Sequence, residues 1–594
     1  MRIVRNSRRV VLWTALAAAL AGCASQGDRP SQPEASSTFR AGLGSVTASR
    51  HMAASANPLA SEAGREVLRA GGSAVDAAIA IQMVLTLVEP QSSGIGGGAF
   101  LLHWDGRTVA AYDGRETAPL AADEKLFLLP DGKAMPFYDA VVGGRSVGTP
   151  GTVRMLQVAH QRHGKLSWAQ LFTPAIQLAE QGFPMSARLN MQLGAEKYLK
   201  ADASAAAYFY QADGSAKAVG TLLRNPALAA TLRAIAANPD SFYQGEIPAD
   251  IVKAVQASPN AGRLAISDFA TYRVKLREPV CSDYKAWRVC GFPPPSSGGI
   301  AVAQMLGIFA SRNIAAVPPI TVNGKLEPQS DAVHLFAEAG RLAFADRALY
   351  VADADFVTVN VAGLLDPAYL KQRAQLIGAR SMGVAKAGVP PGTQPAAAAD
   401  SSPPRSATSH VSVVDSDGNA VSMTTTIEDV FGSRMMVRGF MLNNQLTDFS
   451  FLPAADGVPI ANRVQPGKRP RSSMAPTLVF DRASGQLVAT IGSPGGSQII
   501  GYVAKTLVGI LDWNLDVQQA ISLPNFGSRN GPTELESAQF SPQTIEALKA
   551  RGHEVREIDM ASGLQGIVRV RLPDGVLGWS GGADPRREGV AVGD

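Results

Sequence analysis

Residues 401–415 read Ser-Ser-Pro-Pro-Arg-Ser-Ala-Thr-Ser-His-Val-Ser-Val-Val-Asp, and the character of the chain changes within them, at Thr408. The stretch before it, 388–407, is rich in Pro, Ala and Ser and has too little apolar surface to order itself. The segment after it alternates apolar and polar residues, as a half-buried strand does. A hydroxyl residue at this junction either opens an ordinary strand or becomes the first residue of a new chain, with its own α-amine as base.

The segment after Thr408 predicts a β-hairpin. Two alternating runs flank Ser416-Asp417-Gly418, and a three-residue loop with Gly in the left-handed position is a favoured hairpin connection. Counting outward from this loop pairs Thr408 with Thr426, with both hydroxyls on one side of the hairpin and roughly 5 Å between the Cβ atoms. The pair either relays a proton or only stabilises the sheet.

The first 23 residues have the three parts of a signal peptide. Four arginines precede an apolar run over 10–20, which is too short to span a membrane as a mature helix. The run ends in Leu-Ala-Gly-Cys, which resembles the bacterial lipobox and makes Cys23 the expected lipidation site. We expect residues 1–23 to be removed, 24–42 to be a flexible tether, and the protein to be periplasmic and lipid-anchored to the outer membrane. The alternative is a plain leader with a chance cysteine.

The charge of the chain excludes one class of partner. The formal charge of +5 includes the four leader arginines, and the leader has no acid, so the mature chain carries 5 − 4 = +1. No basic patch interleaved with aromatic residues occurs, so nothing indicates a nucleic-acid partner. With 594 residues and 46% hydrophobic composition, the chain can bury a large core.

Two cysteines remain after the leader, Cys281 and Cys290. Folding the segment between them about Lys285-Ala286 places the two side chains opposite each other on a hairpin. In an oxidising compartment such a pair favours a disulfide. Two buried free thiols are the alternative, and no histidine lies nearby to suggest a metal site.

The rest of the chain predicts helices and strands in groups. Helices are expected over 57–70, 74–88, 331–350 and 500–511. After Thr408 the chain is strand-rich, with strands expected over 411–415, 420–427, 436–444, 475–481, 486–492, 566–571 and 576–580. Because helices and strands do not strictly alternate, we expect a layered α/β fold with antiparallel sheet.

Three short motifs after Thr408 suit a zwitterionic ligand. A glycine-rich turn at 492–497 leads into a helix, and its backbone N–H groups could stabilise an oxyanion. A basic turn with two hydroxyls at 468–473 suits a carboxylate, and amides with one carboxylate at 443–448 suit an ammonium group. Each motif alone is equally compatible with a tight turn or a polar strand end.

With these motifs in this order, the chain resembles a known family, the γ-glutamyltransferases, over about residues 43–590. The matching stretches include Gly71-Gly-Ser-Ala-Val-Asp-Ala-Ala78, Pro293-Pro-Pro-Ser-Ser-Gly-Gly299, Ala345-Asp-Arg347, Asp417-Gly-Asn-Ala-Val421, Asn443-Asn-Gln445, Arg471-Ser-Ser-Met-Ala-Pro-Thr477 and Gly492-Ser-Pro-Gly-Gly496. The resemblance implies an N-terminal-nucleophile hydrolase fold, an αββα sandwich of two central antiparallel sheets flanked by helices. It implies one such unit built jointly by a large subunit, 43–407, and a small catalytic subunit, 408–594.

The resemblance also implies a catalytic mechanism without metal or cofactor. The precursor would cut itself between Ala407 and Thr408, and Thr408 would then attack the γ-carbonyl of a glutamyl substrate such as glutathione. Thr426 would hydrogen-bond to the nucleophile, while Gly495 and Gly496 would donate backbone N–H groups to the oxyanion. The acyl group would pass to water or to an amino acid or peptide acceptor.

The same resemblance assigns a receptor for the glutamyl group. Arg115, Ser472 and Ser473 would hold its α-carboxylate. Gln445 and Asp448 would hold its α-ammonium.

The sequence departs from the family pattern at two places. Glu428 stands where many members have Asn, so it joins the substrate-binding candidates, either strengthening ammonium binding or moving the substrate. The segment 449–467 is short and has no Tyr, which indicates an open site where hydrolysis rivals transfer. An acylase for glutaryl side chains and an uncleaved amino-acid-binding lipoprotein remain the alternative functions.

Overall fold

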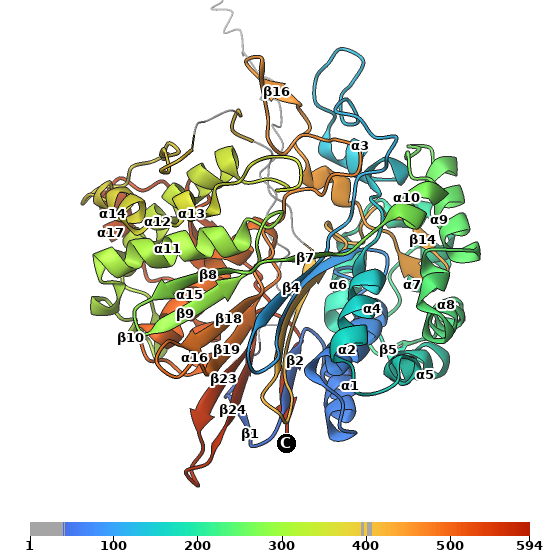
Figure 1. Cartoon of the computed structure of the whole chain (residues 1–594), viewed down its shortest axis with the longest axis horizontal. Coiled ribbons are helices and arrows are strands. Elements are labelled where there is room, and N and C mark those ends of the chain that lie inside the picture. The colour runs from blue at the N-terminus through green and yellow to red at the C-terminus, as the bar shows by residue number, and fades with distance from the viewer. Residues whose placement is uncertain (1–39, 41, 394–396, 401–406) are drawn as a thin grey trace, which may run out of the picture.

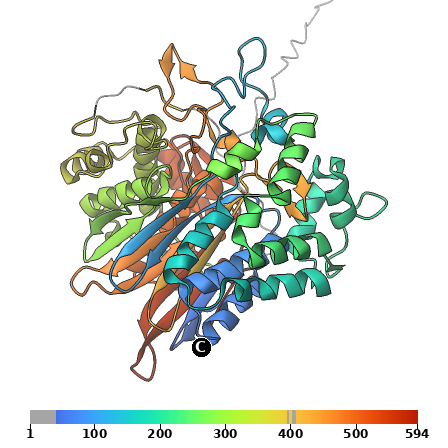
Figure 2. The ribbon, with the colours of Figure 1, turned by 45° about the vertical axis from the view of Figure 1, so that its right-hand side comes forward.

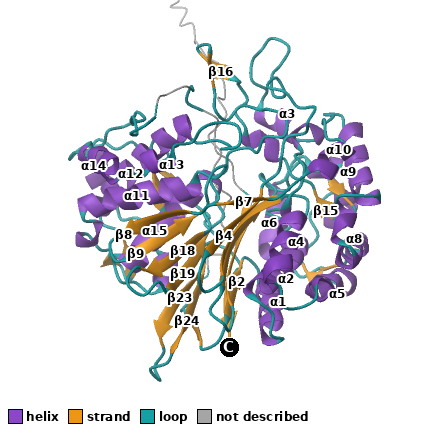
Figure 3. Cartoon of the chain, viewed as in Figure 1, coloured by secondary structure: helices purple, strands orange, loops and turns teal. Residues whose placement is uncertain are grey.

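The computed structural model describes residue 40 and residues 42–393, 397–400 and 407–594. Two sheets lie face to face at its centre, and helices cover the outer face of each (Figures 1 and 3). This is the layered fold that the sequence predicts. The expected signal peptide, the lipidation site Cys23 and nearly all of the tether lie outside the described residues. In the described part of the chain, no helix combines the length and apolarity needed to cross a membrane.

The first sheet contains the strand that begins at Thr408. All of its neighbouring strands are antiparallel. In spatial order the strands are β25 (Val590–Gly593), β2 (Met52–Ser55), β12 (Thr408–Val414), β13 (Ala420–Thr426), β3 (Gly98–Trp104), β4 (Val109–Gly114) and β7 (Lys275–Arg277).

The second sheet is also antiparallel throughout. Its strands, in spatial order, are β1 (Val46–Ala48), β24 (Leu577–Ala583), β23 (Gln565–Arg571), β19 (Leu487–Gly492), β18 (Thr477–Asp481), β9 (Trp287–Gly291) and β8 (Val280–Tyr284). In both sheets, strands from before and after position 408 are neighbours. The two parts of the chain therefore form one folded unit.

Helices pack on the outer face of each sheet. The first sheet is covered by α1 (Pro58–Arg69), α2 (Ala74–Val88), α4 (Thr152–His163), α5 (Thr173–Gln181) and α8 (Pro226–Ala237), which come forward in Figure 2. The second sheet is covered by α11 (Gly298–Arg312), α12 (Ser330–Tyr350), α15 (Ile499–Leu511) and α16 (Val517–Ser522). Every residue of α2 is buried, as its apolar sequence predicts.

Shorter elements complete the layers and surround the site. The helices among them are α3 (Phe137–Val141), α6 (Ala187–Ala195), α7 (Ala203–Phe209), α9 (Glu246–Ala257), α10 (Ile266–Thr271), α13 (Val361–Leu364), α14 (Pro367–Gln375) and α17 (Pro542–Ala550). The strands are β5 (Phe183–Pro184), β6 (Leu222–Leu223), β10 (Ile320–Val322), β11 (Lys325–Glu327), β16 (Ala454–Ala455), β17 (Val458–Pro459), β20 (Phe526–Gly527), β21 (Thr533–Glu536) and β22 (Val555–Ile558).

The predicted helix starts and hairpin are confirmed. The Asn57 side chain caps α1 by accepting from the Leu59 N–H, and Ser73 forms a capping box with Asp76 at α2. Thr408 pairs with Thr426 in the predicted register.

One predicted strand is wrong. Residues 436–444 form two short strands, β14 (Met436–Val437) and β15 (Phe440–Met441), because the chain reverses at Arg438 and Gly439 with φ angles of 48° and 87°. An arginine in the left-handed region is uncommon, so the sequence gives little sign of this turn.

Hydroxyl groups connect the two sheets near the centre of the molecule. Side chains alternate along β12 and β13, so that every second residue faces the second sheet. Ser412 donates to the carbonyls of Thr490 and Gln565, both at 3.3 Å, and Ser422 donates to the Ile491 carbonyl at 3.2 Å. We call these contacts the hydroxyl seam. Because Thr408 and Thr426 follow in the same alternation, they also face the second sheet.

Described residues of the segment before Thr408 contact the rest of the fold. Within 388–407 the structure describes 388–393, 397–400 and 407. The Gly388 carbonyl accepts from the Tyr350 hydroxyl at 2.6 Å, and Asp400, which is 7% exposed, contacts Arg471 at 2.8 Å. These residues are ordered by partners elsewhere in the fold, which composition alone does not reveal.

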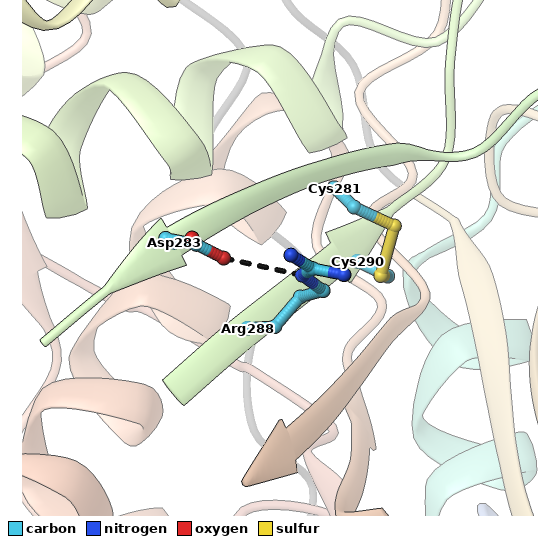
Figure 4. The surroundings of a disulfide bond; sticks show 4 residues. All are labelled: Cys281, Asp283, Arg288 and Cys290. Atoms are coloured by element: carbon cyan, nitrogen blue, oxygen red, sulfur yellow. Dashed lines mark hydrogen bonds and ion pairs between the residues drawn. A yellow bond between two sulfur atoms is a disulfide. The ribbon is translucent and has the colours of Figure 1, made fainter. Parts of the chain in front are cut away.

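Cys281 and Cys290 form a disulfide, as predicted for a hairpin in an oxidising compartment. The two residues are direct partners on β8 and β9, at an edge of the second sheet (Figure 4). Asp283 and Arg288 form an ion pair on the same hairpin at 3.1 Å.

Replacing both cysteines by serine is expected to lower the free energy of unfolding by about 2–3 kcal/mol, because the disulfide closes a short loop in the unfolded chain. Thermal unfolding of C281S/C290S against the parent protein measures this, with the ion-pair variant Arg288→Gln as a control on the same hairpin. An unchanged melting temperature in the double variant would show that the hairpin is held by its neighbours alone.

Candidate active site

Thr408 and Thr426 face each other at one end of the hydroxyl seam. The Thr408 hydroxyl donates to Thr426 Oγ1 at 3.4 Å, and the Thr426 hydroxyl donates to the Ala407 carbonyl at 2.6 Å. The Glu428 N–H donates to Thr426 Oγ1 at 2.8 Å. Because Thr426 accepts from two donors, its own proton is directed to the carbonyl of the peptide bond before Thr408. That carbonyl oxygen is where negative charge would develop if the Thr408 hydroxyl attacked the carbonyl carbon.

A glycine turn lies where the second sheet meets α15. Gly495 has φ 128° and Gly496 has φ 57°, and a Cβ on Gly495 would lie 2.5 Å from Tyr502 Cε2. Glycine is therefore required at Gly495 on both conformational and steric grounds. Gly496 lines the same cavity as Thr408, and Gly495 precedes it in the turn.

Arg115 and Asp448 form an ion pair in the expected glutamyl receptor. Arg115 is 1% exposed, and its Nη2 contacts Asp448 at 2.5 Å. Its Nε donates to the Pro470 carbonyl and its Nη2 to the Arg471 carbonyl, both at 3.2 Å, so the guanidinium is rigidly held. Burial raises the pKa of the adjacent Glu116 to about 8, which keeps that side chain neutral near pH 7. Asp448 is thus the acid that compensates the charge of Arg115.

Amides hold the two acids of the receptor. Gln445 donates to Asp448 at 2.8 Å, and Asn444 donates to Glu428 Oε2. Glu428 adopts φ 82°, a left-handed conformation that costs a non-glycine residue about 1–3 kcal/mol. Asn adopts this region more readily than Glu, which is a backbone reason for the Asn expected at this position. In this chain the result is a second buried carboxylate beside Thr426.

Ser472 and Ser473 complete the expected receptor, and Ser473 contacts Arg347, to which the sequence analysis gave no role. Ser472 Oγ accepts from the Met474 N–H at 3.1 Å, and Ser473 Oγ accepts from Arg347 Nη2 at 2.7 Å. Arg347 also donates from Nε to Ser297 Oγ at 2.7 Å. Burial and the nearby charge of Arg471 hold the pKa of the Arg347 guanidinium well below its usual value.

These side chains surround one cavity of about 520 Å³. The sequence-predicted residues that line it are Arg115, Ala407, Thr408, Thr426, Glu428, Gln445, Asp448, Ser472, Ser473 and Gly496. Arg471, from the basic turn predicted at 468–473, also lines it. Further charged lining residues, which the sequence analysis missed, are Arg347, Asp400, Arg529, Glu534 and Arg556. Arg347 lies within a family-like stretch, which is the one signal that could have identified it. Arg529 and Arg556 carry no motif.

Histidines do not serve this site. His410 is fully buried between the sheets, where it hydrogen-bonds Thr424 and Ser412, and burial lowers its pKa to about 3. Both of its ring nitrogens are already engaged in these hydrogen bonds and its basicity is low, so it is not available as a base for the Thr408 hydroxyl.

A distant cluster, His334, Glu338 and His553, has the composition of a metal site. Its atoms are already paired: the two rings share a hydrogen bond of 2.7 Å, and Glu338 accepts from Arg341 at 2.7 Å. Thr533 also contacts the His553 ring at 2.7 Å. The cluster is a hydrogen-bond network that joins α12 to β21.

A threonine at the start of a central strand, in a sandwich of two antiparallel sheets, is the arrangement of the N-terminal-nucleophile hydrolases. The chain belongs to the gamma-glutamyltranspeptidase family, whose sequence pattern it matches over residues 60–594. It is therefore an enzyme of that family.

Curated proteins and a solved structure agree with this assignment. The chain is 36% identical over 555 residues to the glutathione hydrolase proenzyme of Bacillus subtilis (strain 168), covering 91% of each chain. It is also 36% identical over 561 residues to the acylase ACY 1 proenzyme of Pseudomonas sp. (strain V22), covering 92% of this chain and 94% of that one. The structure resembles the cephalosporin acylase from Bacillus halodurans with a TM-score of 0.77 and 27% identity, covering 94% and 98% of the two chains.

Thr426→Val is expected to slow cleavage of the Ala407–Thr408 bond by about 10²–10³-fold, because it removes the donor to the carbonyl that becomes an oxyanion. Thr426→Ser keeps that donor and should cleave nearly normally. Mass spectrometry of the purified chains over time measures both rates. Thr425→Val is the matched control, since Thr425 is on the same strand and its buried hydroxyl has no hydrogen-bond partner among the described residues. Equal rates in T426V and T425V would refute the role of this donor.

Proposed function

We propose that this protein is a self-cleaving γ-glutamyl hydrolase and transferase that acts on glutathione and related γ-glutamyl compounds. The observation that carries the proposal is the placement of Thr408 between a directed hydroxyl donor and the glycine turn, in one cavity with a receptor for both charges of an amino acid. The glutathione hydrolase proenzymes among its relatives support the substrate.

The self-cleavage step follows from the contacts of Thr408. Its Oγ attacks the carbonyl carbon of Ala407, Thr426 stabilises the oxygen, and the C–N bond breaks as the nitrogen takes a proton. Water then hydrolyses the resulting ester, leaving a carboxylate on Ala407 and a free α-amine on Thr408. The products are the subunits 43–407, together with any tether, and 408–594.

In turnover the freed α-amine is the base for the Thr408 hydroxyl, since it belongs to the same residue and no histidine of the described residues lines the cavity. Backbone N–H groups of Gly495 and Gly496 stabilise the tetrahedral oxyanion. Arg115 with Ser472 and Ser473 holds the α-carboxylate of the glutamyl group.

The α-ammonium of the glutamyl group is placed among the acids of the receptor. Asp448, Gln445 and Glu428 hold it, and the γ-glutamyl ester on Thr408 passes to water or to an amine. The short segment 449–467, with its β16–β17 hairpin, supports hydrolysis as a substantial fraction of turnover.

The similarity to acylases favours a second candidate, an acylase for glutaryl-type side chains. A glutaryl group has no ammonium, so it would make no use of the acceptors that Asp448 and Gln445 offer to one. These ammonium-binding groups therefore favour the γ-glutamyl substrate.

The wild-type protein is expected to release aniline from a γ-glutamyl anilide and not from the matching glutaryl anilide. The rate should rise with pH through about 7.7–8.0, because the α-amine acts only when it is deprotonated. Thr408→Ala should remain one chain and be inactive, whereas Thr47→Ala, distant from the cavity, should cleave and turn over normally. Preference for the glutaryl anilide would reverse the choice between the two candidates, and wild-type turnover by T408A would refute the nucleophile.

We also propose that the protein is exported and attached to the outer membrane through a lipid on Cys23. The basic, apolar and Leu-Ala-Gly-Cys parts of residues 1–23 support this. Expression with a radiolabelled fatty acid should label the wild-type protein, and Cys23→Ser should be unlabelled and recovered outside the membrane fraction. Absence of label in the wild type would show that residues 1–23 act as an ordinary signal peptide without lipidation of Cys23.

A further inference from the structure

The cavity has a second charged wall that the glutamyl receptor does not use. Its residues come from the connection between β20 and β21, from β21 itself and from the start of β22: Arg529, Asn530, Gly531, Pro532, Glu534 and Arg556. Arg529 Nη1 donates to Ser497 Oγ at 3.1 Å, so this wall begins directly beside the Gly496 turn. When the glutamyl part of a substrate occupies its receptor and the scissile amide lies at Thr408, the amine part of the substrate lies against this wall.

Arg529 keeps donors available for a ligand. It forms a fork with Glu534, from Nε at 3.1 Å and from Nη2 at 2.6 Å. A guanidinium has five N–H groups. The two hydrogen bonds to Glu534 and the one to Ser497 use three of them. One N–H on Nη1 and one on Nη2 remain, and the side chain is already fixed in place by Glu534.

One arginine beside this wall has no carboxylate in direct contact among the described residues. Arg115, Arg471 and Arg529 have Asp448, Asp400 and Glu534 as carboxylate partners, respectively. Arg347 also lines the cavity, and no carboxylate of the described residues lies within 4.0 Å of it. Arg347 donates instead to Ser297 and Ser473, so its charge lies between the receptor and the second wall without a carboxylate in direct contact in the described part of the chain.

The second wall is rigid before any ligand binds. The Asn530 side chain accepts from the Ala385 N–H at 2.7 Å and donates to the Ala385 carbonyl at 3.0 Å. The Gly531 carbonyl accepts from Arg341 Nη2 at 3.0 Å, within the network around His553. A wall fixed in this way loses little conformational entropy on binding, which favours recognition of a defined group.

We propose that Arg529 and Arg556, with the charge of Arg347 beside them, form a subsite for a carboxylate on the amine part of the substrate. This rests on the proposed function. In hydrolysis the carboxylate belongs to the leaving peptide, and in transfer it belongs to the acceptor. The preferred substrates are γ-glutamyl peptides with a free C-terminal carboxylate, ahead of γ-glutamyl amides and amines.

The test compares a γ-glutamyl dipeptide with the same peptide carrying a C-terminal carboxamide. Wild-type kcat/KM should be about tenfold higher for the acid, the size expected for one charge-assisted hydrogen bond. Arg529→Gln and Arg556→Gln should each bring the acid-to-amide ratio toward one. The ratio does not depend on the fraction of active enzyme, so a variant that folds or cleaves poorly still gives a valid result.

Arg233→Gln is the matched control for Arg556→Gln, because Arg233 and Arg556 are both half-exposed and each pairs with a surface glutamate. It should keep the wild-type ratio of acid to amide turnover.

Turnover of a γ-glutamyl anilide, which has no carboxylate on its amine part, separates the subsite proposal from the proposed function. A wild-type ratio near one with the anilide still cleaved would overturn the subsite and leave the proposed function standing. No anilide turnover would overturn the proposed function itself, and an unchanged ratio in both R529Q and R556Q would overturn the assignment to these arginines.

Discussion

The hydroxyl seam between the two sheets is the constraint on which the site depends. Ser412 and Ser422 donate to carbonyls of the facing sheet, and each such bond fixes a distance and a direction that apolar packing alone would leave adjustable. A slip of one residue along β12 would turn every side chain to the opposite face. The seam therefore fixes Thr408 toward the glycine turn and not toward α2, before any substrate is present.

Around Thr408, the cavity arranges its charged side chains so that most of them are paired. The ion pairs Arg115–Asp448 and Arg529–Glu534 hold their members in place, while amides orient the remaining acids. A zwitterionic substrate replaces existing interactions by equivalent ones, which limits the desolvation cost of binding. Specificity then depends on geometry, since a ligand lacking one charge leaves its partner buried and unpaired.

Sequence reasoning predicted the parts of the site that depend on local pattern. The Thr408–Thr426 register follows from alternation and one loop glycine, and the helix starts at Asn57 and Ser73 follow from capping chemistry. It missed Arg529, because only tertiary packing brings this residue to the cavity. It also missed the turn at Arg438, because this residue adopts a left-handed conformation that arginine rarely shows. Composition also gives no sign of the contacts that Gly388 and Asp400 make before Thr408.

The interleaving of strands from the two sides of position 408 has a consequence for the lifetime of the molecule. β12 and β13 lie between β2 and β3, and β18 pairs with β9, so neither fragment carries a complete sheet. While the chain is continuous, its folding is unimolecular. Once the bond is cut, recovery from unfolding requires two separate polypeptides to meet and reassemble strand by strand, at a rate that depends on their concentration. Cleavage thus changes a reversible fold into one whose persistence is set by its unfolding rate.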